Sequence, residues 1–293
     1  QSLSGSLLRI QEILPLVVTI HHPITKDHKL EMQNANNWKE KLSSKRWHNF
    51  LPMQKRVAPM LKKIICVSKP SKKDIVEEFH VDPNRIEVIL NGIDINTFSP
   101  CSFDKREENK LITTASADIP LKGLKYLVKA LPKILHSFPK TTLTVIGKSP
   151  NNSEVSKLIE ELNLSNVITF RSGISEKEIV DLYHSSELAV IPSLYEGFGF
   201  GAGEAMACGV PLISTHSGGL EEVVGDAALK IMPSSAEEIE KAVIKLFNNP
   251  EDMRKLSIKG RQRMEEIFDW KIAASSYESS FKAVIESFIN EYN

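Results

Sequence analysis

Short apolar runs alternate with longer amphipathic segments along most of the chain. The segments at 124–138 and 175–186 repeat their apolar residues with the period of a helix. Continuous apolar runs separated by helices predict parallel strands whose sheet is covered on both faces, which is an α/β fold with doubly wound sheets. The expected strands lie at 16–20, 63–68, 86–91, 111–115, 142–147, 167–170, 188–193 and 211–215.

A polar stretch at 91–110 indicates a domain boundary. It carries Asn-Gly and Ser-Pro turn signals and no apolar periodicity. The pattern predicts an N-terminal domain at 1–95, with about three strands, and a second domain at 96–270, with five or six. A C-terminal helix at 271–293 could pack on either domain, and we expect it to pack back on the N-terminal one.

Composition excludes some partners. The 293 residues carry 37 basic and 37 acidic side chains, so no overall field favours nucleic acid. No apolar run approaches the roughly 20 residues that cross a bilayer. Three cysteines (Cys66, Cys101 and Cys208) stand far apart, which indicates reduced thiols. We therefore expect a cytoplasmic location, with a peripheral contact at the inner face of the membrane as a further hypothesis.

That hypothesis comes from an uneven charge distribution. Residues 39–73 include eleven Lys or Arg and one acid, Glu40. One interpretation is an ordinary solvated helical face. The other is a surface that rests on anionic lipid or binds an anionic acceptor. Aromatic and apolar side chains interrupt the segment at Trp38, Trp47, Phe50 and Leu51, and the expected contributors are Lys45, Arg46, Lys55 and Arg56.

Candidate chemistry gathers in a glycine-rich stretch at 193–215, where Glu196 and Glu204 lie on either side of a glycine run that begins a helix. Glycine lets a backbone approach a ligand closely, and the first turn of a helix attracts anions. This pattern indicates a phosphate site. Because carboxylates repel phosphate, the two glutamates must address another part of the ligand, most simply its hydroxyls.

Other phosphate-binding motifs fit less well. The spacing of Gly197, Gly199 and Ala202 matches a dinucleotide fingerprint, but the glycines do not directly follow a strand and no acid ends the next one. A phosphate-cradling loop before Lys148 would need glycine where Thr142 stands. The chain has no Asp-x-Asp pair to hold a cation for metal-dependent sugar transfer. We therefore expect no metal site and no cofactor.

Three further segments fit the glycine-rich stretch. Lys122 follows the first strand of the second domain, where a lysine could neutralise a diphosphate. Residues 170–173 end another strand and offer backbone groups to a base. His21 ends a strand of the first domain, although a histidine at such a place is often structural.

Together these motifs resemble one family. "EGFGFGAGE" followed by "AMACGVPLI" closely resembles the Glu-x7-Glu motif of the family 4 glycosyltransferases, retaining enzymes of the GT-B fold with two Rossmann-like domains. "VILNGIDINTFSP" is similar to that family's hinge, "PLKGL" to its diphosphate-binding loop and "IFDWKIAA" to the start of its last helix. The resemblance covers nearly the whole chain. It implies that a sugar moves from a nucleotide-diphosphate sugar to an acceptor hydroxyl on a glycan, lipid or small molecule.

The resemblance also implies roles for residues. Glu196 would contact hydroxyls of the transferred sugar, Glu204 the ribose, and Lys122 the diphosphate as it leaves. His21 would lie on the acceptor side near the reacting carbon, with His22 an equal alternative. The departing phosphate would take the acceptor proton. Other donor contacts would come from Arg171 and Ser172 at the base, and from Gly197, Phe198, Gly199, Phe200 and Gly201 at the sugar and diphosphate.

The chain departs from the family's pattern twice. The family usually has a second diphosphate contact, an arginine, where this chain has Ser116 and Ala117. The first domain also lacks the family's initial strands and glycine-rich loop, so we expect it to be incomplete. A chain of this kind is expected to bind a nucleoside diphosphate weakly, to aggregate and to transfer little sugar.

Two alternatives to transfer stay open. A nucleotide-sugar 2-epimerase of the same fold would use the same nucleotide crevice but needs no acceptor. A degenerate module would bind the nucleotide sugar without reaction. A requirement for an acceptor separates transfer from epimerisation.

Overall fold

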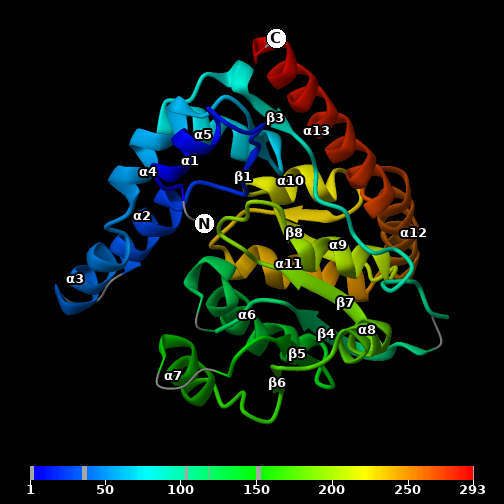
Figure 1. The fold of residues 1–293 in the computed structure, drawn as a ribbon. Helices are drawn as coiled ribbons and strands as arrows, with labels where there is room; N and C mark the ends of the chain where they lie inside the picture. The colour runs from blue at the N-terminus through cyan, green and yellow to red at the C-terminus, as the bar shows by residue number, and fades with distance from the viewer. Residues whose placement is uncertain (1–2, 35–37, 103–104, 118, 150–152, 293) are drawn as a thin grey trace. The chain divides into compact units, whose positions relative to one another are not determined.

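A computed structural model describes residues 3–34, 38–102, 105–117, 119–149 and 153–292 (Figure 1). The chain divides into two compact units. Unit 1 comprises residues 1–92 and 271–293, and unit 2 comprises residues 93–270. Each unit is an α/β structure with its own parallel sheet.

The sheet of unit 2 has a topological switch point at its centre. Its strand order is β6-β5-β4-β7-β8-β9, and all neighbouring pairs are parallel. The chain runs outward from β4 to β6 and then returns to the other side of β4 as β7. In such sheets a crevice opens beyond the carboxyl ends of the two strands where the direction reverses. The strands are β4 (Glu107–Thr113), β5 (Thr142–Ile146), β6 (Ile168–Arg171), β7 (Ser186–Ile191), β8 (Leu212–Thr215) and β9 (Leu229–Ile231).

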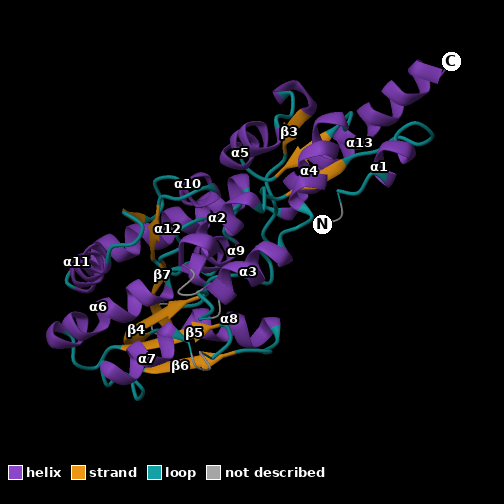
Figure 2. Cartoon of the chain, turned by 90° about the vertical axis from the view of Figure 1, so that its left-hand side faces the viewer, coloured by secondary structure: helices purple, strands orange, loops and turns teal. Residues whose placement is uncertain are grey.

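Helices of unit 2 pack on the sheet in two layers, and Figure 2 shows them beside the strands. Helices α6, α7 and α11 bury their apolar stripes in one continuous core with the sheet. Helices α9 and α12 pack against each other and against β8. The bounds are η4 (Pro120–Lys122), α6 (Leu124–Ser137), α7 (Glu154–Glu161), α8 (Glu176–Ser185), α9 (Phe200–Ala207), α10 (Gly219–Val224), α11 (Ala236–Phe247) and α12 (Pro250–Ile267).

The residues of the central strands explain why helices cover both faces. Leu111 and Val190 belong to the core beneath α6 and α11. A second set lies in register across three neighbouring strands and consists of Ile112, Ala189 and Leu212. Because successive side chains of a strand point to opposite faces, this set faces the opposite layer of helices. Since all five side chains are fully buried, the central strands of this sheet have no solvent face here, as continuous apolar runs predict.

Unit 1 has a smaller parallel sheet, in the order β1-β2-β3. Its core gathers Leu61, Ile64, Ile75 and Phe79. The last helix returns to this unit, where Ser280 donates to a carboxylate oxygen of Glu87. The elements are α1 (Ser6–Ile10), β1 (Val18–Ile20), α2 (Thr25–Asn34), α3 (Trp38–Trp47), α4 (Leu51–Val57), η1 (Ala58–Met60), β2 (Ile64–Cys66), α5 (Lys69–Phe79), η2 (Pro83–Arg85), β3 (Ile86–Val88) and α13 (Trp270–Tyr292).

The basic segment at 39–73 runs through α3, α4 and β2 into α5, and parts of it are buried. Leu51 is buried in unit 1, and β2 is buried along its whole length. Trp38 and Trp47 are exposed by 69% and 76%. The two exposed tryptophans therefore lie on α3, whereas exposed basic side chains also occur on α4 and α5.

Within the described ranges, no helix is both long and apolar enough to cross a membrane.

A close backbone approach joins the loop after β4 to the loop after β7. Gly123 has φ of +69°, and a Cβ added there would lie 2.0 Å from the carbonyl oxygen of Pro192. Gly173 has φ of +66°, but a Cβ there would meet nothing within 4 Å. The two positions share the same left-handed backbone and differ in available space.

We expect Gly123→Ala to lower the free energy of unfolding more than Gly173→Ala does. The left-handed strain of about 1–2 kcal/mol is common to both variants, whereas only Gly123→Ala forces two loops apart. Denaturant unfolding of the full chain measures both. Equal losses would show that the approach of Gly123 to Pro192 does not contribute.

Candidate functional site

Two oppositely charged side chains meet at the switch point of unit 2. Lys122 ends η4, which follows β4, and Glu196 lies in the loop after β7. Lys122 Nζ lies 2.6 Å from Glu196 Oε1. The side chains are exposed by 30% and 14%, so a ligand can reach both, although the pair is partly shielded from water. The strand order explains the meeting, because β4 and β7 are neighbours.

Backbone contacts hold these two loops together before any ligand binds. The Leu194 amide donates to the Leu121 carbonyl at 2.7 Å. Gly123 packs directly on Pro192, as described above. The Lys122–Glu196 pair is therefore held by the loop backbones as well as by its own charges, which is the preorganisation that binding sites require.

Glu204 lies on α9, one turn into the helix that follows the glycine run. Its Oε2 accepts a hydrogen bond from the Tyr183 hydroxyl at 3.2 Å, and the same hydroxyl lies 3.2 Å from the Gly201 carbonyl oxygen. Burial raises the pKa of the Glu204 carboxyl, and the bond from Tyr183 opposes that rise. Burial also raises the pKa of Tyr183 well above its usual value, so this residue is a donor at neutral pH.

The start of α9 is open to an anion. Gly199 caps the helix in a left-handed conformation, with φ of +113°, and no side chain caps the first amides. Unsatisfied amides and the helix dipole favour a negative group at such an end. Phe200, the first residue of the helix, is 46% exposed. The glycine run thus places a helix start without a side-chain cap a few residues after Glu196 in the chain.

Ser116 and Ala117 provide no second cation after β4. The Ser116 hydroxyl accepts a hydrogen bond from the Lys148 amide at 3.0 Å, which joins the loops after β4 and β5. Ala117 is buried. These side chains are neutral, so within this loop the positive charge comes from Lys122.

Arg171 and Ser172 lie at the carboxyl end of β6, and both are exposed. The Gly147 amide donates to the Arg171 carbonyl at 2.8 Å. Because β5 separates β6 from β4, these residues stand two strands from the switch point, roughly 10 Å away at the usual strand spacing. They share the site's edge of the sheet without contacting Lys122 or Glu196.

His21 and His22 follow β1 in unit 1. His21 is exposed as a whole residue, yet partial desolvation of its ring lowers its pKa, and the neighbouring His22 lowers it further. His22 lines a cavity of about 70 Å³ with the edge of β1. His21 is therefore mostly neutral at pH 7.

The sequence did not indicate several residues that hold the site. Ser193 donates to Glu196, and Tyr183 donates to Glu204. The apolar run at 188–193 includes Ser193 only as its last residue, and Tyr183 looks like one more apolar position of a helix. Their role depends on tertiary contacts that no short motif encodes.

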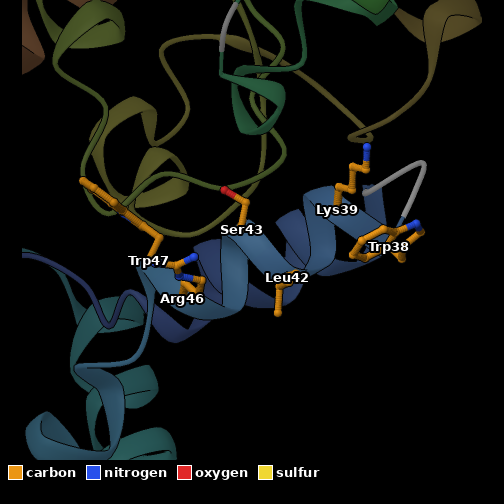
Figure 3. A pocket seen from close by; sticks show the side chains of 6 residues that line it. All are labelled: Trp38, Lys39, Leu42, Ser43, Arg46 and Trp47. Carbon is orange, nitrogen blue, oxygen red and sulfur yellow. The ribbon is translucent and has the colours of Figure 1, made fainter.

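A second surface feature lies on α3 of unit 1. Figure 3 shows Trp38 and Trp47 near the two ends of the helix, with Lys39 and Arg46 among the side chains between them. The hollow has a volume of about 520 Å³ and is lined by Trp38, Lys39, Leu42, Ser43, Arg46 and Trp47.

No metal centre accompanies either feature. In the part of the chain that the structure describes, no group of three or more His, Cys, Asp or Glu side chains is arranged to hold a metal ion.

Comparison with known proteins connects this geometry to a family. Residues 97–263 match the family model described as glycosyl transferases group 1, and residues 2–97 match that of glycosyltransferase family 4. The MMP alpha-(1->4)-mannosyltransferase of Mycolicibacterium hassiacum is 37% identical over 289 residues. The chain belongs to the family 4 glycosyltransferases. It is therefore an enzyme of glycosyl transfer.

The match extends over much of each relative. The alignment covers 97% of this chain and 69% of the mannosyltransferase. A D-inositol 3-phosphate glycosyltransferase of Rhodococcus jostii is 26% identical, over 75% of this chain and 52% of that protein. The chain thus spans about half to two thirds of the length of these relatives.

Solved structures show the same fold. The sucrose-phosphate synthase of Thermosynechococcus elongatus superposes with a TM-score of 0.79 at 23% identity, over 97% of this chain and 71% of that one. Anabaena Alr3699/HepE in complex with UDP-glucose superposes with a TM-score of 0.73 at 18% identity, over 98% and 76%. Both confirm the GT-B fold with its two Rossmann-like domains.

We expect Glu204→Ala to weaken the binding of a nucleoside diphosphate by about 1–3 kcal/mol, the usual loss when a hydrogen bond to a charged group is removed. Glu160→Ala, which removes an exposed acid on α7, is the matched control and should leave affinity unchanged. Isothermal calorimetry with UDP and GDP measures both variants. Unchanged affinity in Glu204→Ala would contradict a ribose contact.

Proposed function

We propose that the chain catalyses retaining, metal-independent transfer of a hexosyl group from a nucleotide-diphosphate sugar to an acceptor hydroxyl in glycan biosynthesis. The observation that carries the proposal is the pairing of Lys122 with Glu196 beside the open end of α9. A cation and free helix amides suit a diphosphate, and a carboxylate suits sugar hydroxyls. The switch point brings the two kinds of group together.

The reaction breaks the bond between the anomeric carbon and the diphosphate oxygen, and that oxygen keeps the electron pair. Lys122 and the first amides of α9 stabilise the negative charge that develops there. The acceptor oxygen forms its bond to the anomeric carbon on the face that the diphosphate leaves. The departing phosphate oxygen takes the acceptor proton, so the step needs no protein base.

The remaining residues have supporting roles in this proposal. Glu204 accepts hydrogen bonds from the ribose, and Arg171 and Ser172 lie along the edge that leads to the base. His21 acts on the acceptor side, where its lowered pKa keeps the ring neutral. Both matched family models describe glycosyltransferases, which favours transfer over the epimerase and over a degenerate module.

A test of the function uses the full chain with UDP-glucose, GDP-mannose and a panel of acceptor sugars. We expect release of the nucleoside diphosphate to depend on the acceptor. Epimerised donor recovered without an acceptor would contradict transfer, and binding without any turnover would favour the degenerate module.

Glu196→Gln is the variant that separates binding from turnover. We expect turnover to fall by at least tenfold, because a charged hydrogen bond to the sugar is lost. The variant should bind the nucleoside diphosphate more tightly, since Lys122 no longer has a carboxylate that competes with phosphate. Steady-state kinetics and calorimetry measure the two effects. Equal losses of turnover and of affinity for the nucleoside diphosphate would contradict the assignment of Glu196 to the sugar.

We further propose that α3 makes a peripheral contact with anionic lipid at the inner face of the membrane. Within the described residues, three other lysines of segment 39–73 pair with acids from elsewhere in unit 1: Lys55 with Glu78, Lys62 with Glu291 and Lys63 with Glu87. Lys39, Lys41, Lys45 and Arg46 on α3 have no such pair among those residues. Exposed tryptophans beside unneutralised cations favour a membrane interface.

We expect the chain to sediment with anionic vesicles at low salt and to be released as salt rises. The double variant Lys45→Glu and Arg46→Glu should abolish sedimentation. The double variant Lys241→Glu and Lys245→Glu on α11 changes net charge equally and serves as control. If the parent chain does not sediment with the vesicles, or if both double variants lose sedimentation equally, α3 is an ordinary solvated helical face.

A further inference from the structure

One oxygen of Glu196 has two hydrogen-bond donors of different kinds. Lys122 Nζ lies 2.6 Å from Oε1, and the Ser193 hydroxyl donates to the same oxygen at 2.9 Å. Ser193 is 1% exposed and stands two residues after the end of β7. The hydroxyl is therefore a fixed and buried donor, whereas Lys122 has a flexible and partly exposed side chain.

The backbone around Ser193 is held in turn by the end of β8 and the loop that follows it. The Thr215 and Ser217 hydroxyls both donate to the Ser193 carbonyl, at 2.6 and 2.9 Å. Because these bonds reach the Ser193 backbone, they do not depend on its side chain. Removing the Ser193 hydroxyl therefore leaves the position of the loop intact.

The same loop also holds the Glu196 backbone. The Gly219 amide donates to the Glu196 carbonyl at 2.7 Å. A Cβ on Gly218 would lie 2.3 Å from the Glu196 carbonyl oxygen, and one on Gly219 would lie 2.2 Å from the Gly197 carbonyl oxygen. Only glycines permit this approach. The backbone of Glu196 is thus fixed, and the remaining freedom lies in its side chain.

Donor binding changes the partners of that side chain. A diphosphate carries more negative charge than one carboxylate, so it draws Lys122 away from Glu196. Glu196 then loses its charged partner at the moment when it must bind the sugar. The Ser193 hydroxyl cannot follow the phosphate, because it is short, buried and attached to a fixed backbone. It remains on Oε1 and leaves Oε2 to accept hydrogen bonds from the sugar.

We propose that Ser193 is a positioning residue that keeps the Glu196 carboxylate oriented toward the transferred sugar after Lys122 has moved to the diphosphate. The inference rests on the proposed function and adds to it a residue that acts through Glu196. It assigns the binding of the diphosphate and the binding of the sugar to different residues of one site. Lys122 acts on the nucleoside diphosphate, and Ser193 acts on the sugar alone.

The test compares affinity for the donor with affinity for its diphosphate. Calorimetry on the full chain with UDP and UDP-glucose, and with GDP and GDP-mannose, gives a ratio of dissociation constants for each pair. We expect Ser193→Ala to weaken binding of the sugar nucleotide about tenfold, the scale of one hydrogen bond to a charged group, while affinity for the diphosphate stays unchanged. Ser214→Ala, which removes another buried hydroxyl that does not reach Glu196, should change neither.

A double-mutant cycle checks that Ser193 acts through Glu196. In a Glu196→Ala background, Ser193→Ala should produce no further change in the ratio. Additive losses, or equal losses for sugar nucleotide and diphosphate, would overturn the positioning role. A parent chain that binds none of the four nucleotides would overturn the proposed function, and this inference with it.

Discussion

The pairing of Lys122 with Glu196 is the interaction on which the candidate site of unit 2 depends. It requires β4 and β7 to be neighbours, since each residue lies in the loop that follows one of these strands. It also requires the two loops to touch, which the contact of Gly123 with Pro192 provides. A cation and a carboxylate this close stabilise each other, so neither is an isolated, partly buried charge.

The sequence predicted five strands of unit 2 because β5, β7, β8, the end of β4 and much of β6 are apolar. It missed β9, whose three residues Leu229–Ile231 include a lysine and carry no periodicity. It also placed the start of β4 too late, because this strand begins with the polar residues Glu107 and Glu108. Polar residues occur where a strand extends past its covering helices, and a pattern of apolar positions cannot indicate such extensions.

In the site as well, some residues can be predicted from short sequence motifs and others only from tertiary contacts. The glycine run and the lysine loop can be read from the sequence because each is a short segment with its own backbone requirement. Ser193 and Tyr183 could not be found in that way, since each acquires its role from a partner brought near by the fold. The charge of segment 39–73 likewise depends on distant acids, since Glu78, Glu87 and Glu291 pair with three of its lysines across long stretches of sequence. Among the described residues of the segment, exposed tryptophans and exposed basic side chains occur together on α3.

This arrangement explains why two glutamates border a glycine run that suits phosphate. Glu204 is held back by Tyr183 along α9, one turn from the helix end, so its charge does not oppose an anion at the first amides. Glu196 stands closer, but its charge is balanced by Lys122 until a ligand arrives. Under the proposed function, donor binding is an exchange of partners rather than an addition of charge: the diphosphate would replace the carboxylate on Lys122, and sugar hydroxyls would replace the lysine on Glu196. An exchange of this kind favours ligands that bring both groups together, because a diphosphate alone would leave a partly buried carboxylate without its charged partner.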